Sequence, residues 1–219
     1  MGHTGTVICS NGAVVWDFDA DRVISARTMR LADVMQIRQI IKQLRPSALF
    51  AGETLTGFHV EPGFIENESS ELLAQFSPAP LAETLTDDDG VVKFLAVLRE
   101  GTADEFLAAV APAVGPLAAV THSAPGVAML EIGVPGVNKA VALADYAQSL
   151  GIEAADVVAF GDMPNDIEML RWAGDGYAMA SGHPDAIRAA GQIAPAFDDD
   201  GVAQVLEAKL AALGHLLRP

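Results

Sequence analysis

The chain has 219 residues and a mass of 22.8 kDa; 51% of its residues are hydrophobic and its mean hydropathy is +0.30. This composition excludes a disordered chain, because the apolar content suffices for a sizeable core. Lys and Arg number 13 and Asp and Glu number 29, so the net charge is −16 and the electrostatic field repels nucleic acid and anionic lipid. We therefore expect neither nucleic acid nor a membrane as a partner. A phosphorylated small molecule can still bind where a local cation or metal ion overrides this field.

The N-terminus and the cysteine content predict a cytoplasmic location. Residues 1–4 contain no basic stretch followed by an apolar run, and the single Cys9 cannot form an internal disulfide. Residues 106–130 carry no charged side chain, but several prolines and glycines interrupt them. We expect a helix followed by buried strands there and not a membrane span.

The first part of the chain predicts a hairpin, a helix and a series of strands. Two apolar runs joined at Asn11-Gly12, a turn-forming dipeptide, predict a strand, a turn and a second strand over residues 6–17. Apolar residues at helical spacing predict an amphipathic helix over 25–43. The next predicted elements are strands over 48–52, 57–61 and 91–98, a helix over 103–114, and strands over 117–121 and 127–132.

The rest of the chain alternates helix and strand. The predicted elements are a helix over 137–150, a strand over 156–160, a helix over 167–173, a short apolar run over 176–180, and helices over 183–190 and 202–213. This alternation is typical of a parallel α/β layer. We expect an α/β fold whose core comes from both ends of the chain, residues 1–23 and 131–219, interrupted by an inserted α+β domain at 24–130.

The strongest chemical signal follows the predicted strand over 156–160. In the segment Gly161-Asp162-Met163-Pro164-Asn165-Asp166, Pro164 suits the first turn of a helix, so Asp162 and Asp166 lie about one turn apart. Two converging carboxylates with no adjacent Lys or Arg repel each other unless they share a cation, and oxygen ligands suit Mg²⁺. The alternative is structural: Asp162 or Asn165 caps the helix and Asp166 favours its positive end.

A second signal is Lys139 in the segment Gly136-Val137-Asn138-Lys139. A lysine in a first helical turn gains nothing from the helix dipole, which favours a role toward another charge such as a phosphate or a carboxylate. The alternative is a solvated surface lysine.

These motifs resemble the haloacid dehalogenase-like hydrolases, specifically the Cof-type phosphatases with a large α+β cap. Residues 161–166 are similar to the family's Gly-Asp-x-x-Asn-Asp metal motif, residues 136–143 to its lysine motif, and residues 10–13 to the Asn-Gly-Ala turn that precedes the cap. The resemblance implies a Rossmann-like parallel-sheet core, a type C2B cap over 24–130, and Mg²⁺ held by Asp162 and Asp166. It further implies a catalytic Lys139 that binds the phosphoryl group, with Asn165 and Asn11 among the residues that support or bind phosphate.

The chain departs from the family pattern at its start. Family members open with a strand ending in Asp-x-Asp-Gly-Thr, whose first Asp is the nucleophile, and no such motif precedes Asn11. Asp17-Phe18-Asp19 follows an apolar run, but Ala20-Asp21 replaces Gly-Thr, and we expect an exposed acidic turn there. We therefore assign no nucleophile, and we expect a core that lacks its N-terminal part through a shortened sequence.

The predicted function is that of a Mg²⁺-dependent phosphatase acting on a small phosphorylated metabolite, such as a sugar phosphate. The alternative is a short, non-catalytic module that binds phosphorylated metabolites or has a regulatory role. His122 and Ser123 suggest contact with the substrate from the cap, and residues 198–200 favour a turn with a helix N-cap. Neither the substrate nor the oligomeric state has a signature in the sequence.

Overall fold

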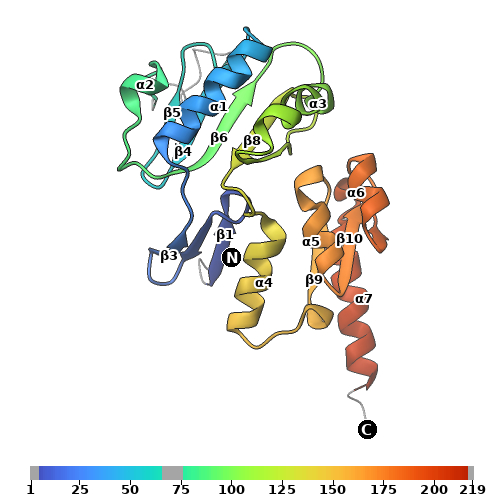
Figure 1. Ribbon diagram of the computed structural model, residues 1–219. Coiled ribbons are helices and arrows are strands. Elements are labelled where there is room, and N and C mark those ends of the chain that lie inside the picture. Colours follow the sequence, from blue (N-terminus) through green and yellow to red (C-terminus); the bar gives the residue numbers. More distant parts are fainter. Residues whose placement is uncertain (1–4, 66–75, 217–219) are drawn as a thin grey trace. The chain divides into compact units, whose positions relative to one another are not determined.

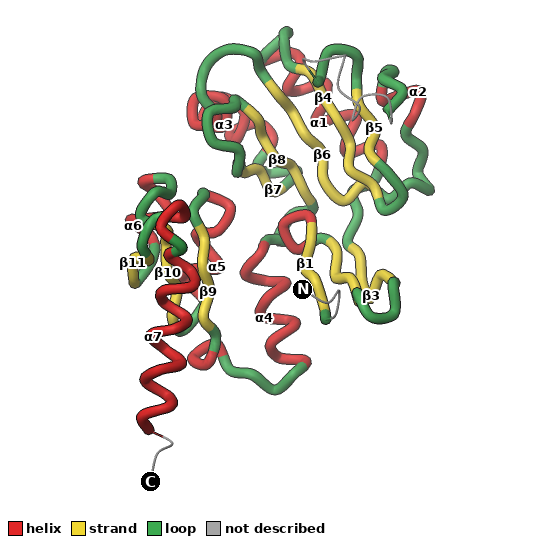
Figure 2. The backbone as a smooth tube through the Cα atoms, turned by 180° about the vertical axis from the view of Figure 1, so that it is seen from behind, coloured by secondary structure: helices red, strands yellow, loops and turns green. Residues whose placement is uncertain are grey.

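The computed structural model describes residues 5–65 and 76–216, which belong to two compact units, residues 1–138 and 139–219 (Figures 1 and 2). We refer to these as unit 1 and unit 2. The first four residues, on which the expectation about a secretory signal depends, lie outside the described residues.

Unit 1 opens with a three-stranded antiparallel sheet. Strands β1 (Thr6–Cys9) and β2 (Val14–Asp17) flank a 3-10 turn (Ser10–Gly12), and Val7 faces Trp16 in the register. This confirms the predicted strand, turn and strand. Strand β3 (Arg22–Ala26) then pairs with β2, in order β1-β2-β3.

The predicted start of the first helix, at residue 25, is wrong. Helix α1 begins at Leu31, because the preceding backbone is held extended by partners distant in sequence. The Arg27 amide donates to the Ala13 carbonyl at 2.8 Å, and Met29 forms a bridge with Val91.

The larger sheet of unit 1 is antiparallel, with strand order β5-β4-β6-β8-β7. Its strands and the accompanying helices are α1 (Leu31–Leu44), β4 (Leu49–Thr54), β5 (Phe58–Val60), α2 (Leu81–Thr84), β6 (Val91–Val97), α3 (Ala103–Val114), β7 (Ala119–Thr121) and β8 (Met129–Gly133). The predicted strands and the helix over 103–114 are confirmed; the short α2 was not predicted. None of the helices within residues 5–65 and 76–216 has the length and apolar composition that a membrane span requires.

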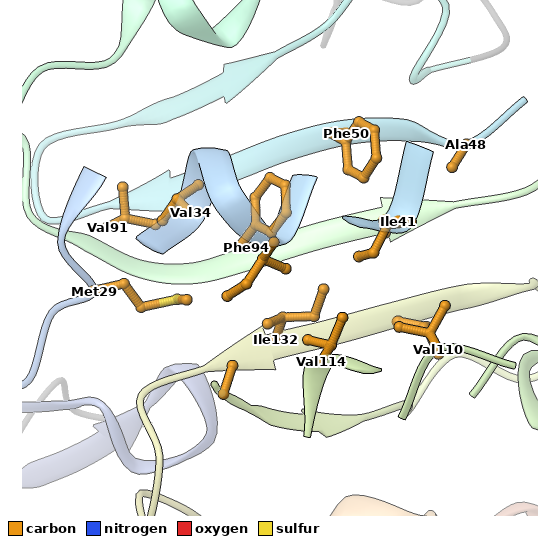
Figure 3. Close-up of a cluster of buried hydrophobic side chains, with 14 of the residues drawn as sticks. Met29, Val34, Ile41, Ala48, Phe50, Val91, Phe94, Val110, Val114 and Ile132 are labelled. Atoms are coloured by element: carbon orange, nitrogen blue, oxygen red, sulfur yellow. The ribbon is translucent and has the colours of Figure 1, made fainter. Parts of the chain in front are cut away.

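The largest hydrophobic cluster described for unit 1 lies on one face of this sheet and includes residues of α1 and α3. Phe50 of β4 and Phe94 of β6 stack with ring centroids 5.3 Å apart, and both are fully buried (Figure 3). Because side chains alternate along a strand, their neighbours Glu53 and Lys93 project from the opposite face. Helix residues that complete this core include Val34, Ile37, Ile41, Phe106, Val110 and Val114.

Unit 2 contains a parallel sheet of order β11-β10-β9. Its elements are α4 (Lys139–Ser149), β9 (Val158–Gly161), α5 (Ile167–Trp172), β10 (Asp175–Met179), α6 (Pro184–Ala189), β11 (Gln192–Ala194) and α7 (Gly201–Leu216), with 3-10 turns at Ala154–Asp156, Pro164–Asp166 and Phe197–Asp199. The predicted parallel α/β layer is confirmed, and the three-residue β11 was missed. The division into a core and an inserted cap stays a prediction.

Candidate phosphate and metal site

The candidate site is the loop that leaves the carboxyl end of β9. Gly161 ends the strand, and the buried Asp166 folds back over the loop: its Oδ2 accepts from the backbone amides of Asp162 at 3.0 Å and Met163 at 3.1 Å. A Cβ atom at Gly161 would lie 2.4 Å from the Cβ of Asp166. This close approach requires glycine, so the local sequence dictates the shape of the loop.

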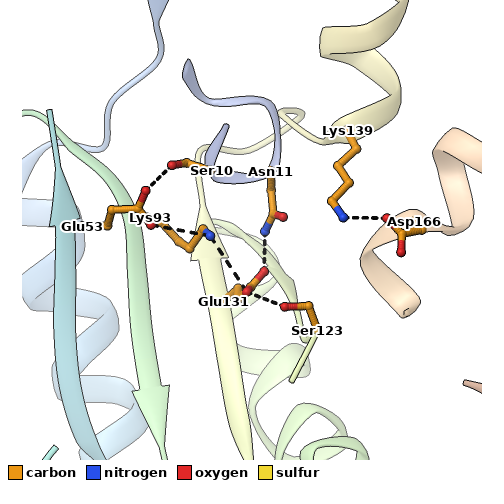
Figure 4. Close-up of polar contacts among 8 residues, drawn as sticks. All are labelled: Ser10, Asn11, Glu53, Lys93, Ser123, Glu131, Lys139 and Asp166. Atoms are coloured by element: carbon orange, nitrogen blue, oxygen red, sulfur yellow. Dashed lines mark hydrogen bonds and ion pairs between the residues drawn. The ribbon is translucent and has the colours of Figure 1, made fainter. Parts of the chain in front are cut away.

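Lys139, the first residue of α4, reaches this loop. Its Nζ lies 2.5 Å from Oδ1 of Asp166 (Figure 4). Asp166 is only 3% exposed, whereas a third of the Lys139 side chain is exposed. The structure thus brings together two predicted site residues from separate motifs, in a short hydrogen bond between opposite charges.

The other predicted site residues have different surroundings. The Asp162 side chain is exposed, and its carbonyl accepts from the His183 amide at 2.7 Å. Asn165 is half-buried in the 3-10 turn between the two aspartates. Asn11 belongs to unit 1, where its side-chain amide donates to Glu131 at 2.6 Å.

One premise of the argument for a metal ion is wrong, because a lysine does lie beside the paired aspartates. A carboxylate has about four acceptor positions, and Asp166 uses them for one ammonium and two backbone amides. The remaining capacity of Asp166 and the exposed carboxylate of Asp162 fit a cation that prefers oxygen ligands, such as Mg²⁺. The metal assignment of Asp162 and Asp166 stays a prediction.

Asp17, the candidate for a misplaced nucleophile, caps a turn. Its Oδ1 accepts from the backbone amides of Asp19 at 3.1 Å and Ala20 at 3.0 Å, and its Oδ2 lies 3.6 Å from Arg22 Nε. This is the acidic turn that the sequence favours.

The remaining candidates from the sequence are His122, Ser123 and the acidic run 198–200. The buried His122 places Nε2 2.9 Å from Oδ1 of Asp104, and Ser123 donates to Glu131 at 2.6 Å. In the acidic run 198–200, a 3-10 turn ends at Asp200, whose φ is +55°. That run forms a turn before α7, as predicted.

Sequence reasoning missed a polar network in unit 1. It consists of Ser10, Asn11, Glu53, Lys93, Ser123 and Glu131 (Figure 4). A signal was present: Lys93 and Glu131 are lone charged residues in otherwise apolar strand runs. A charge buried in such a strand requires polar partners.

Comparison with known proteins places these features in a family. The family model described as haloacid dehalogenase-like hydrolase matches residues 1–206. The chain is 38% identical over 79 residues to the 5-amino-6-(5-phospho-D-ribitylamino)uracil phosphatase YitU of Bacillus subtilis, a match that covers 36% of this chain and 29% of that protein. The match thus spans less than a third of this curated relative.

Two solved structures share the fold over most of the chain. SMU.1108c of Streptococcus mutans has a TM-score of 0.80 and 24% identity, covering 94% of this chain and 77% of that one. The HAD subclass IIB sugar phosphatase BT4131 has a TM-score of 0.72 and 19% identity, covering 93% and 75%. Because the family model matches nearly the whole chain, the chain belongs to the haloacid dehalogenase-like hydrolases.

Proposed function

We propose that this protein is a Mg²⁺-dependent phosphatase that hydrolyses monoesters of small phosphorylated metabolites, with sugar phosphates as the preferred class. The observation that carries the proposal is the ion pair between Lys139 and Asp166 at the carboxyl end of β9, which is where α/β sheets bind ligands. The named activities of YitU and BT4131, a phosphoribityl compound phosphatase and a sugar phosphatase, support the substrate class.

We propose roles for the site residues that fit their surroundings. The ammonium of Lys139, a partly exposed side chain held by Asp166, binds a phosphoryl oxygen and stabilises the negative charge of the transition state. Asp162 and Asp166 would hold Mg²⁺, which supplies further charge neutralisation at the phosphoryl group. Asn165 supports the loop between them.

We further propose that the nucleophilic aspartate is supplied by a strand parallel to β9 that is not among the described elements. In the described parallel sheet, β9 pairs with β10 alone, so its other edge can accept a parallel strand. Such a strand would end at the same edge of the sheet as Asp162. The Streptococcus mutans relative has polypeptide that this chain does not match, since the alignment covers 77% of its length.

The alternative function is a non-catalytic module that binds phosphorylated metabolites. It is favoured by the turn-capping role of Asp17, the aspartate whose sequence context most resembles the nucleophile motif. The intact mass of the protein from its source cells separates the two. A mass several kilodaltons above 22.8 kDa supports the enzyme, and a mass of 22.8 kDa supports the binding module.

Activity is tested on the protein isolated from its source and on recombinant variants of that same polypeptide. With Mg²⁺, we expect hydrolysis within a panel of sugar phosphates, lost when the metal is chelated. Lys139→Met should lower kcat/KM by about 10²–10³-fold because one charge-stabilising group is removed. Lys42→Met is the control and should leave it unchanged, since Lys42 donates to the Pro46 carbonyl in unit 1. No hydrolysis across the panel would reject the enzyme proposal.

A further inference from the structure

The missed polar network joins the turn after β1 to the large sheet of unit 1. Glu131 of β8 is its centre: Oε2 accepts from Asn11 Nδ2 at 2.6 Å, and Oε1 accepts from Ser123 Oγ at 2.6 Å. The Nζ atom of Lys93 in β6 lies 3.9 Å from Oε1 of Glu131 and 3.5 Å from Oε2 of Glu53 in β4 (Figure 4). The Ser10 hydroxyl donates to Glu53, which closes the network.

The turn held by this network has an unfavourable backbone conformation. Ser10 and Asn11 have φ of +50° and +57°, the left-handed region that L-residues rarely adopt. Both residues donate from their side chains to carboxylates of the sheet, Ser10 to Glu53 and Asn11 to Glu131. Strained backbone of this kind persists only where the surroundings hold it in place.

The turn in its place also stabilises the buried carboxylate of Glu131. Glu131 is 7% exposed, and a buried charge is tolerated only with hydrogen-bond donors or an opposite charge beside it. Asn11 is the donor to one of its oxygens, while Ser123 and Lys93 serve the other.

The same stretch of chain supports the segment that leads to Lys139. Residues 134–138 connect β8 with α4, whose first residue is Lys139. In the strand before this segment, Glu131 is bound by Asn11. Within this segment, Val137 packs against a hydrophobic cluster formed by Ala13 and Val14, which follow the turn, and Val92.

We propose that Asn11 and Glu131 form a positioning pair. Their hydrogen bond holds the strained turn against β8, and the turn in turn fixes the segment that enters Lys139. Asn11 acts through Glu131 and does not contact the phosphate. The effect on phosphate binding rests on the proposed function, because it assumes that Lys139 binds the phosphoryl group.

The test exchanges the amide and the carboxylate. Asn11→Asp places two carboxylates against each other and should lower the midpoint of thermal unfolding by at least about 4 °C. Glu131→Gln retains an acceptor for Asn11 and should have a smaller effect. The double variant N11D/E131Q restores a donor and an acceptor with their positions reversed, and should recover most of the lost stability. Gln43→Glu, the same amide-to-acid change at an exposed site of unit 1, is the control for added charge.

Two further measurements test whether the pair has a positioning role. In N11D, backbone amide exchange over residues 134–138 should become faster, and the affinity for inorganic phosphate with Mg²⁺ should fall at least about tenfold in calorimetric titration. Both should recover in the double variant. If N11D does not fold, recovery of folded protein on adding Glu131→Gln is the equivalent result.

The remaining outcomes reject one proposal or the other. If the double variant regains stability but not phosphate affinity, Asn11 contacts the phosphate and the positioning role is wrong. If neither property recovers, the pair has no coupling and the inference fails. If the unaltered protein does not bind phosphate, the proposed function fails, and the stability and exchange data alone decide on the pair.

Discussion

Gly161 and Asp166 approach each other so closely that the loop tolerates no side chain at residue 161. The Asp166 carboxylate reaches the amides of Asp162 and Met163 on one side and Lys139 on the other only from this position. A methyl group at 161 would overlap atoms of Asp166 at 2.4–2.9 Å. The geometry of the site therefore depends on the absence of a side chain as much as on the charged groups.

We predict that Gly161→Ala displaces Asp166 from Lys139. Such overpacking costs about 1–3 kcal/mol of unfolding free energy, and the affinity for phosphate should fall because Lys139 loses its partner. Chemical denaturation and phosphate titration measure the two effects. Gly191→Ala is the matched control in unit 2, because a Cβ there meets nothing within 4 Å. A Gly161→Ala protein with unchanged stability would contradict the described packing.

At the scale of single residues, sequence reasoning succeeded where the information is local. Asp162 and Asp166 are four positions apart, so their shared loop follows from spacing. Asn11 and Glu131 are 120 positions apart, and only the folded register of β8 brings them together. No local rule gives such a pair, although the isolated charge of Glu131 shows that a partner is required.

Helices and strands show the same difference between features encoded locally and features that depend on distant residues. Helix α3 has the predicted bounds because its start is encoded locally: Thr102 accepts from the Glu105 amide at 3.2 Å, and Glu105 accepts from the Thr102 amide at 3.0 Å. Strand β3 was missed because its residues are mostly exposed and it exists only through pairing with β2. The first helix starts later than predicted because Arg27 and Met29 pair with residues that are distant in the sequence.

Helix α7 provides a prediction about pH at this scale, because Lys209 links it to Asp175 of β10. The hydrogen bond from Lys209 lowers the pKa of Asp175, and the bond to Asp175 raises the pKa of Lys209. A lowered acid pKa stabilises the fold above about pH 3.9, and that stabilisation is lost as the pH falls through the folded pKa. A raised lysine pKa stabilises the fold below about pH 10.4, and that stabilisation is lost as the pH rises through the folded pKa.

Lys209→Met should therefore destabilise the protein at pH 7, and its deficit relative to the unaltered protein should shrink as the pH approaches 3. Urea denaturation at a series of pH values measures this deficit. For the control Lys42→Met, whose partner is a carbonyl, the effect should not depend on pH in this range. A Lys209→Met deficit that stays constant down to pH 3 would mean that the ion pair contributes nothing.

At the scale of the whole molecule, the two compact units have unequal cores. The largest core cluster of unit 1 contains three fully buried phenylalanines, Phe50 and Phe94 of the sheet and Phe106 of α3. The core cluster described for unit 2 consists of Leu170 and alanines. Since buried apolar area is the main source of stability, unit 2 should be the weaker of the two.

We predict two unfolding transitions, with unit 2 unfolding first, and the two tryptophans allow each to be followed separately. Trp16 lies in unit 1 and Trp172 in unit 2, so Trp172→Phe and Trp16→Phe variants each report on one unit by fluorescence. Leu170→Ala should lower the unfolding free energy of the earlier transition alone, by about 2–5 kcal/mol. Phe94→Ala should lower that of the later transition alone, by about 3–5 kcal/mol. Leu210→Ala, at an exposed site of α7, should change either by less than about 0.5 kcal/mol. Coincident transitions in both reporters would show that the units unfold as one, which their separate cores do not predict.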